Sequence, residues 1–537
     1  MFPSLIPNLP VNKANISVCL TPYIKLKREA SSRVLMSEII SFLQELVKNE
    51  LVQYSIIVLY TIGPILITIY SIGQFHLLYI FLKNRKSYST KAPLYEDGKW
   101  PYVTVQIPMF NELYVAEHVI DACAKLDYPP DKLEIQVLDD STDETLEIAQ
   151  KRASYWKKNG VDVVVIHREN RQGFKAGALH EGTQIAKGEF IAIFDADFRP
   201  NPDFLYKTVG YFQDEKVGVV QTRWGHLNRS YSLLTRAQSL LHDAFFMIEQ
   251  QARSIAGYFL RFNGSGGLWR KETIADAGNW SGETLSEDYD LCLRAQLKGW
   301  KIAYDNEIVA PAELPVTMVD FKVQQYRWTK GRGQIIKKHF WNLTKADLPF
   351  MVKTHAIFDL LNVFINVGVL LLAMLSIPLV FLLKESPELR TFFTIQSLAL
   401  INILIAPWFS WLVFEKYADS LNGKLQEMKS TFFPFLVLII GFPFFMVVSL
   451  IDGFVNKKSF FHRTSKYNAL NSNDSWKNKI YSPSEVPAIT WFEGILAVTF
   501  LLALIIDITI VSVAFIPFHI LLTLGFSSIF VQSVRKA

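Results

Sequence analysis

The sequence predicts an α/β domain with a mostly parallel sheet, inserted between transmembrane α-helices. Half of the 537 residues are hydrophobic, and the long apolar runs gather toward the two ends of the chain. Between them, over residues 88–345, short β-branched runs alternate with helix-like stretches. This alternation is typical of βαβ units, in which consecutive strands pair in parallel.

The charge balance and the cysteines narrow the class of protein. The net charge of +5 comes from 55 cations and 50 anions. This excess is too mild for a nucleic-acid-binding protein and fits a surface that faces a membrane from the cytoplasm. Cys19, Cys123 and Cys292 are scattered without a CxxC pair. We therefore expect no disulfide framework, no zinc site, and a reducing compartment.

The N-terminal part contains one expected membrane span. Residues 1–50 form an extension that ends in an expected amphipathic helix, and residues 51–84 are the expected transmembrane helix. Its apolar run is long enough to cross a bilayer with tilt. Three cations follow the run at once: Lys83, Arg85 and Lys86. Because cations collect on the cytoplasmic side, the N-terminus should lie outside and the next domain inside.

Residues 88–345 hold the predicted sheet. Five runs are expected to be strands: Val103–Ile107, Ile135–Leu138, Val161–Ile166, Phe190–Phe194 and Val217–Val220. Each of the first four precedes a helix-like stretch, which implies βαβ crossovers and a mostly parallel sheet.

Residues 346–537 form the expected C-terminal membrane region. Four runs are expected to cross the bilayer: 358–383, 391–414, 492–511 and 514–532. A further apolar segment, 430–455, is interrupted by prolines and a glycine, and a cation-rich loop at 456–490 follows it. A full crossing of 430–455 would put that loop and the C-terminal cations outside. We therefore expect a re-entrant or interfacial segment there and five full spans in all.

Several polar residues lie within the expected spans: Asp359, Asn362, Asn366, Gln396 and Asn402. Such residues usually face a bundle interior or a water-filled path, and helix–helix hydrogen bonds are the simpler explanation. Asp507 is expected near the turn between the last two spans.

Acids follow three of the predicted strands. Glu112, Asp139-Asp140 and Asp195-x-Asp197 come where the strands end. A single acid at such a place is often only a helix cap or turn residue, but carboxyl ends of parallel strands meet at one sheet edge, where ligands bind. Carboxylates gathered there repel one another unless a cation lies between them. The Asp-x-Asp spacing suits Mg²⁺ or Mn²⁺ shared with a nucleoside diphosphate.

Other polar segments of the domain are less specific by themselves. Lys175 lies between two glycines at a helix start and is either an exposed lysine or a contact to a diphosphate or base. The loop Phe262-Asn263-Gly264 could shape a sugar-sized cavity. Helix capping explains Ser286 and Glu287 but not the further acids on the same terminus, Asp288 and Asp290. An acid held there is either one more residue of the helix end or a general base. The chain has no GxxxxGK[ST] segment, which excludes a P-loop.

The motifs together form a D, DxD, ED, QxxRW series. Its members are Asp140, Asp195-x-Asp197, Glu287-Asp288 and Gln324-x-x-Arg327-Trp328. The series resembles that of processive family-2 glycosyltransferases, which include cellulose, hyaluronan, chitin and mannan synthases. The segments VQIPMFNE, IQVLDDSTD, FKAGAL, AIFDADFRP, FNGSGGLWR and QQYRWTKG resemble the cellulose synthase-like mannan and glucomannan synthases most. The likeness covers residues 100–340 densely and the membrane part loosely.

The resemblance implies a GT-A fold and a membrane-embedded inverting hexosyltransferase. It implies polymerisation of a β-linked polysaccharide, of mannan, glucomannan or β-glucan type, and its translocation across the membrane. The donor would be GDP-mannose or UDP-glucose, with the growing polysaccharide and the bilayer as further partners and an accessory subunit as an option. The protein would be a multi-pass protein of the cell membrane, or of the Golgi in a eukaryote, with its catalytic domain in the cytoplasm.

The resemblance also implies roles for single residues. Asp139, Asp140, Lys175 and Glu112 would contact the donor. Asp197, with Asp195, would bind the metal. Asp288, with Glu287, would be the general base for the acceptor hydroxyl. Arg327 would face the leaving diphosphate. Trp328, with Gln324 and the Phe262–Gly264 loop, would hold the acceptor sugar.

A short segment of the 456–490 loop, FFHRTSK, resembles the FxxTxK gating loop of cellulose synthases, which closes over the donor. Phe461, Thr464 and Lys466 match that pattern.

Two other functions stay open. A lipid-acceptor glycosyltransferase of the ceramide or dolichol type would use the same fold and would make a glycolipid. A catalytically inactive polysaccharide channel or binding protein would keep the architecture without turnover, although every acid of the motif series is present. The donor sugar and nucleotide also stay open between the mannan and the glucan type.

Overall fold

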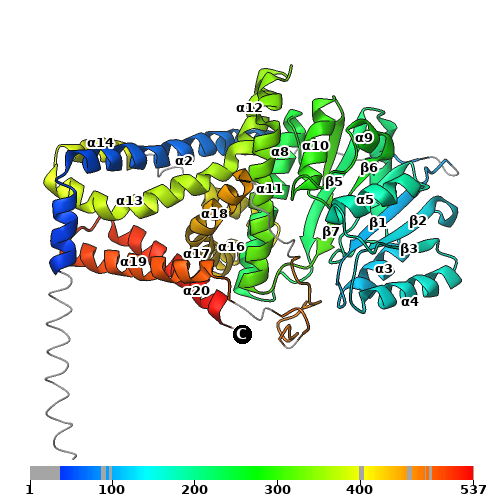
Figure 1. The fold of residues 1–537 in the computed structure, drawn as a ribbon. Coiled ribbons are helices and arrows are strands. Elements are labelled where there is room, and N and C mark those ends of the chain that lie inside the picture. Colours follow the sequence, from blue (N-terminus) through cyan, green and yellow to red (C-terminus); the bar gives the residue numbers. More distant parts are fainter. Residues whose placement is uncertain are drawn as a thin grey trace, which may run out of the picture.

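The computed structural model describes residues 37–85, 92–95, 99–397, 404–455, 463–477, 479–482 and 486–535. Figure 1 shows two parts side by side, an α/β domain and a bundle of long apolar helices, with helix α11 (Met318–Lys345) standing between them. The predicted strand runs all lie in the first part, and the expected spans lie in the second.

One seven-stranded sheet runs through the α/β domain in the order β3-β2-β1-β4-β6-β5-β7. The strands are β1 (Val103–Met109), β2 (Leu133–Asp139), β3 (Val163–His167), β4 (Phe190–Ile193), β5 (Val217–His226), β6 (Gly267–Arg270) and β7 (Lys301–Ala312). All pairs are parallel except those of β6, which is antiparallel to β4 and β5. The predicted mostly parallel sheet is confirmed, and β6 and β7 are additions to it.

Helices cover both faces of this sheet. They are α3 (Ala116–Ala124), α4 (Thr145–Lys158), α5 (Phe174–Ile185), α6 (Phe204–Thr208), α7 (Leu233–Ala244), α8 (Gln251–Ala256), α9 (Lys271–Asp276) and α10 (Glu287–Leu297), with short turns η1 (Pro130–Lys132), η2 (Val209–Gln213) and η3 (Phe245–Gln250). One core joins the strands to α3 and α6 through Val119 and Phe204, and a second joins them to α5 and α10 through Leu179 and Leu291. Strands buried on both faces explain the continuous apolar runs in the sequence.

The membrane part consists of long apolar helices. Its elements are α2 (Glu50–Asn84), α12 (Phe350–Leu361), η4 (Asn362–Phe364), α13 (Ile365–Glu385), α14 (Leu389–Ser397), α15 (Ile405–Phe414), α16 (Leu421–Glu427), η6 (Met428–Phe432), α17 (Phe433–Gly441), α18 (Pro443–Phe454), α19 (Ile489–Thr509) and α20 (Ile516–Val534). In the part of the chain that the structure describes, four stretches are long and apolar enough to cross a bilayer. They fit a membrane protein.

The expected partial span at 430–455 is a bent helix pair. The axis turns by 49° where α17 gives way to α18, at the break before Pro443. Proline cannot donate the backbone hydrogen bond of a helix interior, which accounts for the break. The expected span at 391–414 corresponds to α14 and α15, and the residues between them lie outside the described residues. The number of full crossings stays a prediction.

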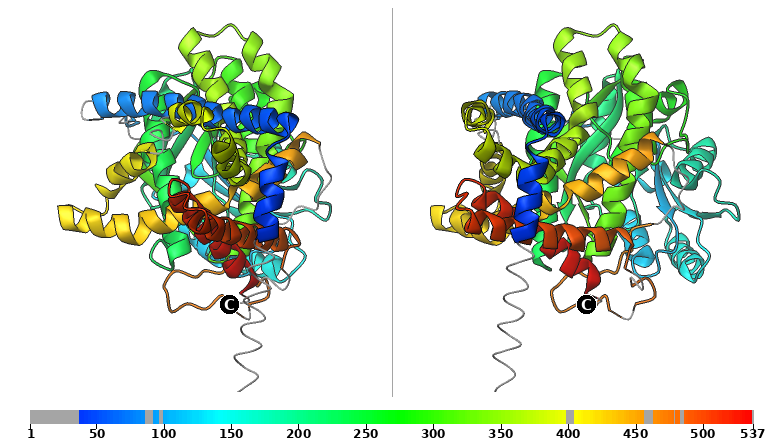
Figure 2. Two further views of the ribbon diagram at one scale, coloured as in Figure 1. Left: turned by 90° about the vertical axis from the view of Figure 1, so that its left-hand side faces the viewer. Right: turned by 60° about the vertical axis from the view of Figure 1, so that its left-hand side comes forward.

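Small residues bring the membrane helices close together. A Cβ atom on Gly63 of α2 would lie 2.9 Å from the Leu372 side chain of α13. Similarly, a Cβ atom on Gly333 of α11 would lie 2.9 Å from the Leu450 backbone oxygen of α18. Backbones that approach this closely gain dispersion contacts that larger side chains would prevent. Residues 37–46 form a further helix that turns from α2 toward α19 (Figure 2), where Val47 packs in one cluster with Ile506.

Polar residues in the membrane part make hydrogen bonds inside the bundle. Asp507 of α19 contacts His519 of α20 at 2.6 Å, and His519 contacts Ser376 of α13 at 2.8 Å. Gln396 donates to Thr61 of α2 at 2.8 Å. These contacts are the helix–helix hydrogen bonds that the sequence suggested as the simpler explanation. Asn402 lies outside the described residues.

Candidate active site

Helix α10 starts with the acid that the sequence offers as a general base. Desolvation, together with the neighbouring Glu287 carboxylate, raises the pKa of Asp288 to about 7. Asp288 Oδ1 accepts a hydrogen bond from the Tyr289 backbone N–H at 2.8 Å. A carboxylate whose pKa lies near neutral can both accept and release a proton under physiological conditions.

The other residues at this terminus have structural roles. Asp290 is fully buried and contacts His339 at 2.7 Å and Arg294 at 2.8 Å. The Ser286 side chain makes no capping hydrogen bond to the helix, so the capping role expected for it is wrong. Its Oγ instead faces Gly331 of α11, where a Cβ atom would collide with it. The base-bearing helix thus rests directly on the helix that carries Arg327.

Lys175 links the acids of two motifs. Its Nζ donates to Asp195 Oδ1 at 2.6 Å and to the Gly264 backbone oxygen at 2.9 Å, and it lies 4.0 Å from Glu287 Oε1. Burial works against its charge, but the Asp195 and Glu287 carboxylates outweigh burial and raise the pKa of Lys175. A Cβ atom on Gly264 would lie 2.9 Å from Asp288 Oδ2, so this backbone lies against the candidate base. Lys175 is therefore an interior ion-pair partner and not an exposed lysine.

A segment from the far end of the chain lies over Asp197. Lys466 Nζ is 2.7 Å from Asp197 Oδ1 and 3.6 Å from Glu112 Oε1, and Arg463 Nη1 donates to Glu112 Oε2 at 3.2 Å. Thr464 Oγ1 accepts a hydrogen bond from Arg327 Nη2 at 3.0 Å. The segment that resembles a gating loop thus reaches the acids after β1 and β4. Phe461 lies outside the described residues.

Burial perturbs both of these acids. Desolvation raises the pKa of Glu112 and of Asp197, and the Lys466 ammonium partly offsets the effect on each. The Lys466 ammonium therefore occupies the position in which a cation would neutralise the crowded carboxylates.

The two acids after β2 are already held by the protein. Asp139 is fully buried, and its Oδ2 accepts hydrogen bonds from the Ser141 backbone N–H at 3.2 Å and from the His167 ring at 2.8 Å. Its Oδ1 is buried and has no hydrogen-bond partner among the described residues. Arg168 binds both oxygens of Asp140, at 2.8 and 2.7 Å. Of the four carboxylate oxygens of Asp139 and Asp140, only Asp139 Oδ1 lacks a hydrogen-bond donor among the residues that the structure describes.

Arg327 and Trp328 project from α11 toward this group. Desolvation lowers the pKa of Arg327, although carboxylates such as Glu287 and Asp195 oppose the effect. The Trp328 side chain is 36% exposed, the largest exposure among the predicted site aromatics. Gln324, one turn earlier, has a buried Oε1 without a hydrogen-bond partner among the described residues. A partly open indole next to a buried guanidinium can present an apolar platform beside an anion site.

Two residues that the sequence did not indicate complete this aromatic surface. The Trp328 ring lies 5.8 Å from the ring of His242 of α7 and 6.5 Å from that of Trp224 of β5. Burial lowers the pKa of His242 to about 3, so it is a neutral imidazole, and its Nε2 has no hydrogen-bond partner in the described part of the chain. No motif marks either residue, because their helix and strand lie far from Trp328 along the chain.

The three residues of the loop at 262–264 differ in what they contact. Phe262 is 1% exposed and packs edge-on against Trp269 in the core of the domain, so it does not face a ligand. Asn263 donates its backbone N–H to Gln221 at 2.8 Å, and Gly264 provides the carbonyl for Lys175. Only Gly264 of this loop therefore meets the other site residues directly.

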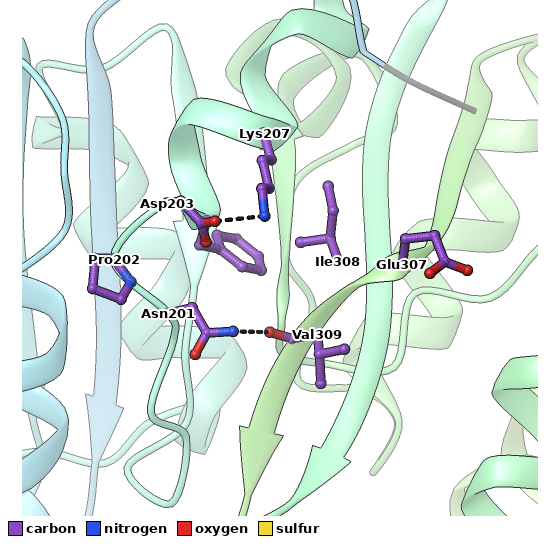
Figure 3. Close-up of a pocket in the computed structure, with 8 residues that line it drawn as sticks. Asn201, Pro202, Asp203, Lys207, Glu307, Ile308 and Val309 are labelled. Carbon is purple, nitrogen blue, oxygen red and sulfur yellow. Dashed lines mark hydrogen bonds and ion pairs between the residues drawn. The ribbon is translucent and has the colours of Figure 1, made fainter. Parts of the chain in front are cut away.

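A separate surface pocket of about 380 Å³ lies away from this group (Figure 3). Its walls include the ion pair of Asp203 with Lys207, 2.5 Å long, and the contact of Asn201 with the Val309 backbone oxygen at 3.5 Å. None of the motif acids lines it, nor does Arg327 or Trp328.

The acid cluster can hold a metal only with help from a ligand. Over the described ranges there is no group of three or more His, Cys, Asp or Glu side chains that could bind a metal ion alone. Two carboxylates, of Asp195 and Asp197, are nevertheless what Mg²⁺ commonly takes from a protein when phosphates supply the other oxygens. The residues present fit a divalent cation that arrives with a diphosphate.

Three comparisons connect this geometry to known proteins. Residues 101–331 match the family described as "Glycosyltransferase like family 2". The probable glucomannan 4-beta-mannosyltransferase 6 of Oryza sativa subsp. japonica is 41% identical over 268 residues, which are 49% of this chain and 47% of that protein. The glucomannan 4-beta-mannosyltransferase 9 of Arabidopsis thaliana is 40% identical over 269 residues, 49% of this chain and 50% of that protein. The matched region spans about half the length of these curated relatives.

A solved structure supports the fold. The mannosyltransferase PcManGT from Pyrobaculum calidifontis, in complex with GDP-Man and Mn²⁺, superposes with a TM-score of 0.50 at 19% identity. The superposition covers 74% of this chain and all of that one. At this identity the likeness concerns the fold, and it agrees with the sheet and flanking helices described above.

Proposed function

We propose, from the match of residues 101–331 to the family described as "Glycosyltransferase like family 2", that the chain is a membrane-embedded, inverting hexosyltransferase that builds a β-linked polysaccharide. The main observation behind the proposal is that Lys175 and Arg327 connect residues of four motifs. These motifs are DxD (Asp195), ED (Glu287), QxxRW (Arg327) and FxxTxK (Thr464). Lys175 contacts Asp195 and lies near Glu287, while Arg327 contacts Thr464. The 40–41% identity to glucomannan 4-beta-mannosyltransferases supports a mannan or glucomannan product over a β-glucan.

The donor is a nucleotide sugar, and we favour GDP-mannose over UDP-glucose because of those relatives. Its base or ribose would donate a hydrogen bond to Asp139 Oδ1, a buried acceptor left without a partner among the described residues. Asp195 and Asp197 would hold Mg²⁺ or Mn²⁺ with the diphosphate oxygens. When bound, this cation supplies Lewis-acid stabilisation of the leaving group. Lys466, now 2.7 Å from Asp197, would exchange that carboxylate for a phosphate oxygen.

Asp288 carries out the proton transfer. Its carboxylate removes the proton of the acceptor hydroxyl while the acceptor oxygen forms a bond to the anomeric carbon of the donor. The bond from that carbon to the diphosphate breaks on the opposite face, so the configuration inverts. The nucleoside diphosphate leaves with the electron pair of the broken bond. Arg327 and Lys175 lie beside this path as fixed positive charges, which lower the free energy of the developing anion.

The acceptor sugar would lie on Trp328. Sugars present C–H faces that pack on an indole ring, and the partly exposed Trp328 offers such a surface. His242 Nε2 and Gln324 Oε1, both buried without hydrogen-bond partners among the described residues, would bind sugar hydroxyls there. An unmet buried polar atom costs free energy, so a hydroxyl that satisfies it gains affinity. The apolar helices next to α11 would bring this surface close to the bilayer, which supports export of the growing chain.

The test is a donor assay on the purified full-length chain. Labelled GDP-mannose, UDP-glucose and UDP-N-acetylglucosamine are offered in turn, and product length is read on a gel. We expect incorporation from GDP-mannose into a polymer that a β-mannanase digests. A glycolipid product would support the lipid-acceptor transferase instead, and the absence of nucleotide release from every donor would support an inactive channel or binding protein.

A base variant tests the mechanism within the same assay. Asp288→Asn should abolish turnover and preserve donor affinity, because the amide cannot accept the proton but keeps the shape of the side chain. Asp276→Asn is the matched control, since Asp276 lies at the surface and pairs with Lys298. Polymerisation at the normal rate by Asp288→Asn would show the base assignment to be wrong.

A further inference from the structure

A second cavity lies in the membrane part, away from the acid cluster. It has a volume of about 180 Å³ and lies between α2, α8 and the α12–α13 connection. Apolar side chains form most of its wall, among them Leu66, Ile69 and Leu361. The side chains of Gln74, Arg253 and His355 line it too. The volume is roughly that of six water molecules in the liquid, enough for part of a lipid headgroup.

Each of these three polar side chains has one buried atom without a hydrogen-bond partner among the described residues. Gln74 is 6% exposed, and Arg253 and His355 are each 2% exposed. Gln74 Oε1, Arg253 Nε and His355 Nδ1 have no hydrogen-bond partner among the described residues. Native proteins rarely leave buried polar atoms unmet, so three around one cavity indicate a missing partner.

The remaining polar atoms of the same side chains are held firmly. Gln74 Nε2 donates to Glu249 Oε2 at 3.2 Å. Arg253 Nη2 lies 3.2 Å from Asp359 Oδ1, and His355 Nε2 lies 2.7 Å from the His76 ring. Each free atom is therefore held in place by its own side chain. The set offers a donor on arginine, an acceptor on glutamine, and an imidazole nitrogen that can serve as either.

The charge around the cavity is positive. Arg253 and Arg261 both pair with Asp359, and Arg332 donates to the Asp359 backbone oxygen at 3.0 Å. Glu249 is the other carboxylate of this cluster, so three guanidinium groups face two carboxylates. Burial raises the pKa of Glu249, and the Arg253 and Arg261 guanidinium groups oppose this effect. An anionic ligand would balance the excess.

The position of the cavity points to lipid as the source of that anion. Two of the three elements around the cavity, α2 and the α12–α13 stretch, belong to candidate membrane spans, whereas α8 with Arg253 belongs to the α/β domain. Ile69 on the α2 side is 46% exposed. Gln74 lies about 14 Å along the helix from Lys83, the first cation after the span. That depth corresponds to the cytoplasmic leaflet if cations mark the inside. Basic pockets between helices on this side are typical sites for anionic headgroups.

We propose that this cavity binds the headgroup of an anionic phospholipid that carries a hydroxyl group, with the acyl chains lying on the apolar face of α2. The phosphate would accept from Arg253 Nε and the His355 ring, and the headgroup hydroxyl would donate to Gln74 Oε1. The site also reaches α10, because Asp359 Oδ2 accepts a hydrogen bond from Tyr289 Oη at 2.9 Å, next to Asp288. The inference does not rest on the proposed function, since binding is measured without turnover.

The test measures lipid retained by the purified full-length chain. The protein is reconstituted in nanodiscs of dioleoyl phosphatidylcholine with one-fifth dioleoyl phosphatidylglycerol or dioleoyl phosphatidic acid, then released and weighed by native mass spectrometry. The variants are Gln74→Leu, which removes the free oxygen, and His355→Phe, whose ring keeps the 4.3 Å stack on Tyr258. Gln396→Leu is the matched control: the Gln396 amide nitrogen donates to Thr61, its oxygen has no hydrogen-bond partner in the described part of the chain, and it does not line this cavity.

We expect one phosphatidylglycerol per wild-type chain and per Gln396→Leu chain. Retention should fall about tenfold in either cavity variant, because Gln74→Leu loses a hydrogen bond to the headgroup hydroxyl and His355→Phe loses one to the charged phosphate. Phosphatidic acid should be retained less than phosphatidylglycerol, because its headgroup carries no glycerol hydroxyl for Gln74. Equal retention by all four proteins, or preferential retention of phosphatidylcholine, would overturn the proposal. If millimolar inorganic phosphate displaced the lipid, the natural ligand would be free phosphate and not a lipid headgroup, which would overturn the proposal.

Discussion

A methyl group at Gly331 should separate the general base from the leaving-group arginine. The added Cβ would lie 3.0 Å from Ser286 N and 3.1 Å from Ser286 Cβ, and closer still to Ser286 Oγ. Rotation of the hydroxyl relieves only the last contact, so α10 and α11 must move apart by about half an ångström to restore ordinary van der Waals distances. Overpacking of this kind costs about 1–3 kcal/mol of stability.

Moving α10 and α11 apart should affect catalysis, because α10 carries the candidate base and α11 carries the arginine that would face the leaving group. Asp288 is two residues beyond Ser286, and Arg327 is one helical turn before Gly331. A misplacement of about 1 Å can cost about a hundredfold in rate, so half of it should lower kcat about tenfold. Donor affinity should change little, since Lys175 and Asp197 lie on other elements.

The assay compares kcat, donor affinity and the thermal midpoint of purified Gly331→Ala with those of two further proteins. The Gly331→Ala, Ser286→Gly double variant removes Oγ and Cβ of residue 286 and should recover more than half of the lost rate. Gly63→Ala is the control: its Cβ would press on Leu372 at 2.9 Å in the α2–α13 contact, so it should lower the thermal midpoint and leave kcat unchanged. Wild-type turnover by Gly331→Ala, or no recovery in the double variant, would refute the reasoning.

Four further predictions concern the site itself. Because only the deprotonated form of Asp288 accepts a proton and its raised pKa is about 7, turnover should rise roughly tenfold from pH 6 to pH 8, and a flat profile would contradict the assignment. Lys466→Met removes the ammonium beside Asp197 and Glu112 and should weaken donor binding at least tenfold by calorimetry, whereas unchanged affinity would exclude a donor contact. Chelation with EDTA should abolish donor binding, and Mn²⁺ or Mg²⁺ should restore it; binding that survives chelation would argue against the metal. His242→Ala should raise the KM for an oligosaccharide acceptor about fivefold with little effect on kcat, and an unchanged KM would remove His242 from the acceptor surface.

Local patterns in the sequence were enough for five of the seven strands and for the motif series. The apolar runs at β1, β2 and β4 are almost wholly buried on both sides, as is most of β5, whereas the edge strand β3 is partly exposed. Short β-branched runs of this kind mark strands by their composition. Strand β6 escaped prediction because its four residues, Gly267–Arg270, are too short for a periodic signal and contain a glycine. The fold class followed from the order of these elements, which is a property of the chain itself.

Three of the contacts described above join residues that lie 86 to 354 positions apart in the sequence. Lys466 meets Glu112, Trp328 meets His242, and Asp359 meets Arg261, and no periodicity or spacing connects the members of any such pair. The motifs named the acids and the guanidinium, but only packing decides that Lys175 reaches Asp195 or that Gln74 is left with an unmet oxygen. Side-chain periodicity reports which face of an element is buried, whereas the partner on that face is set by the tertiary fold.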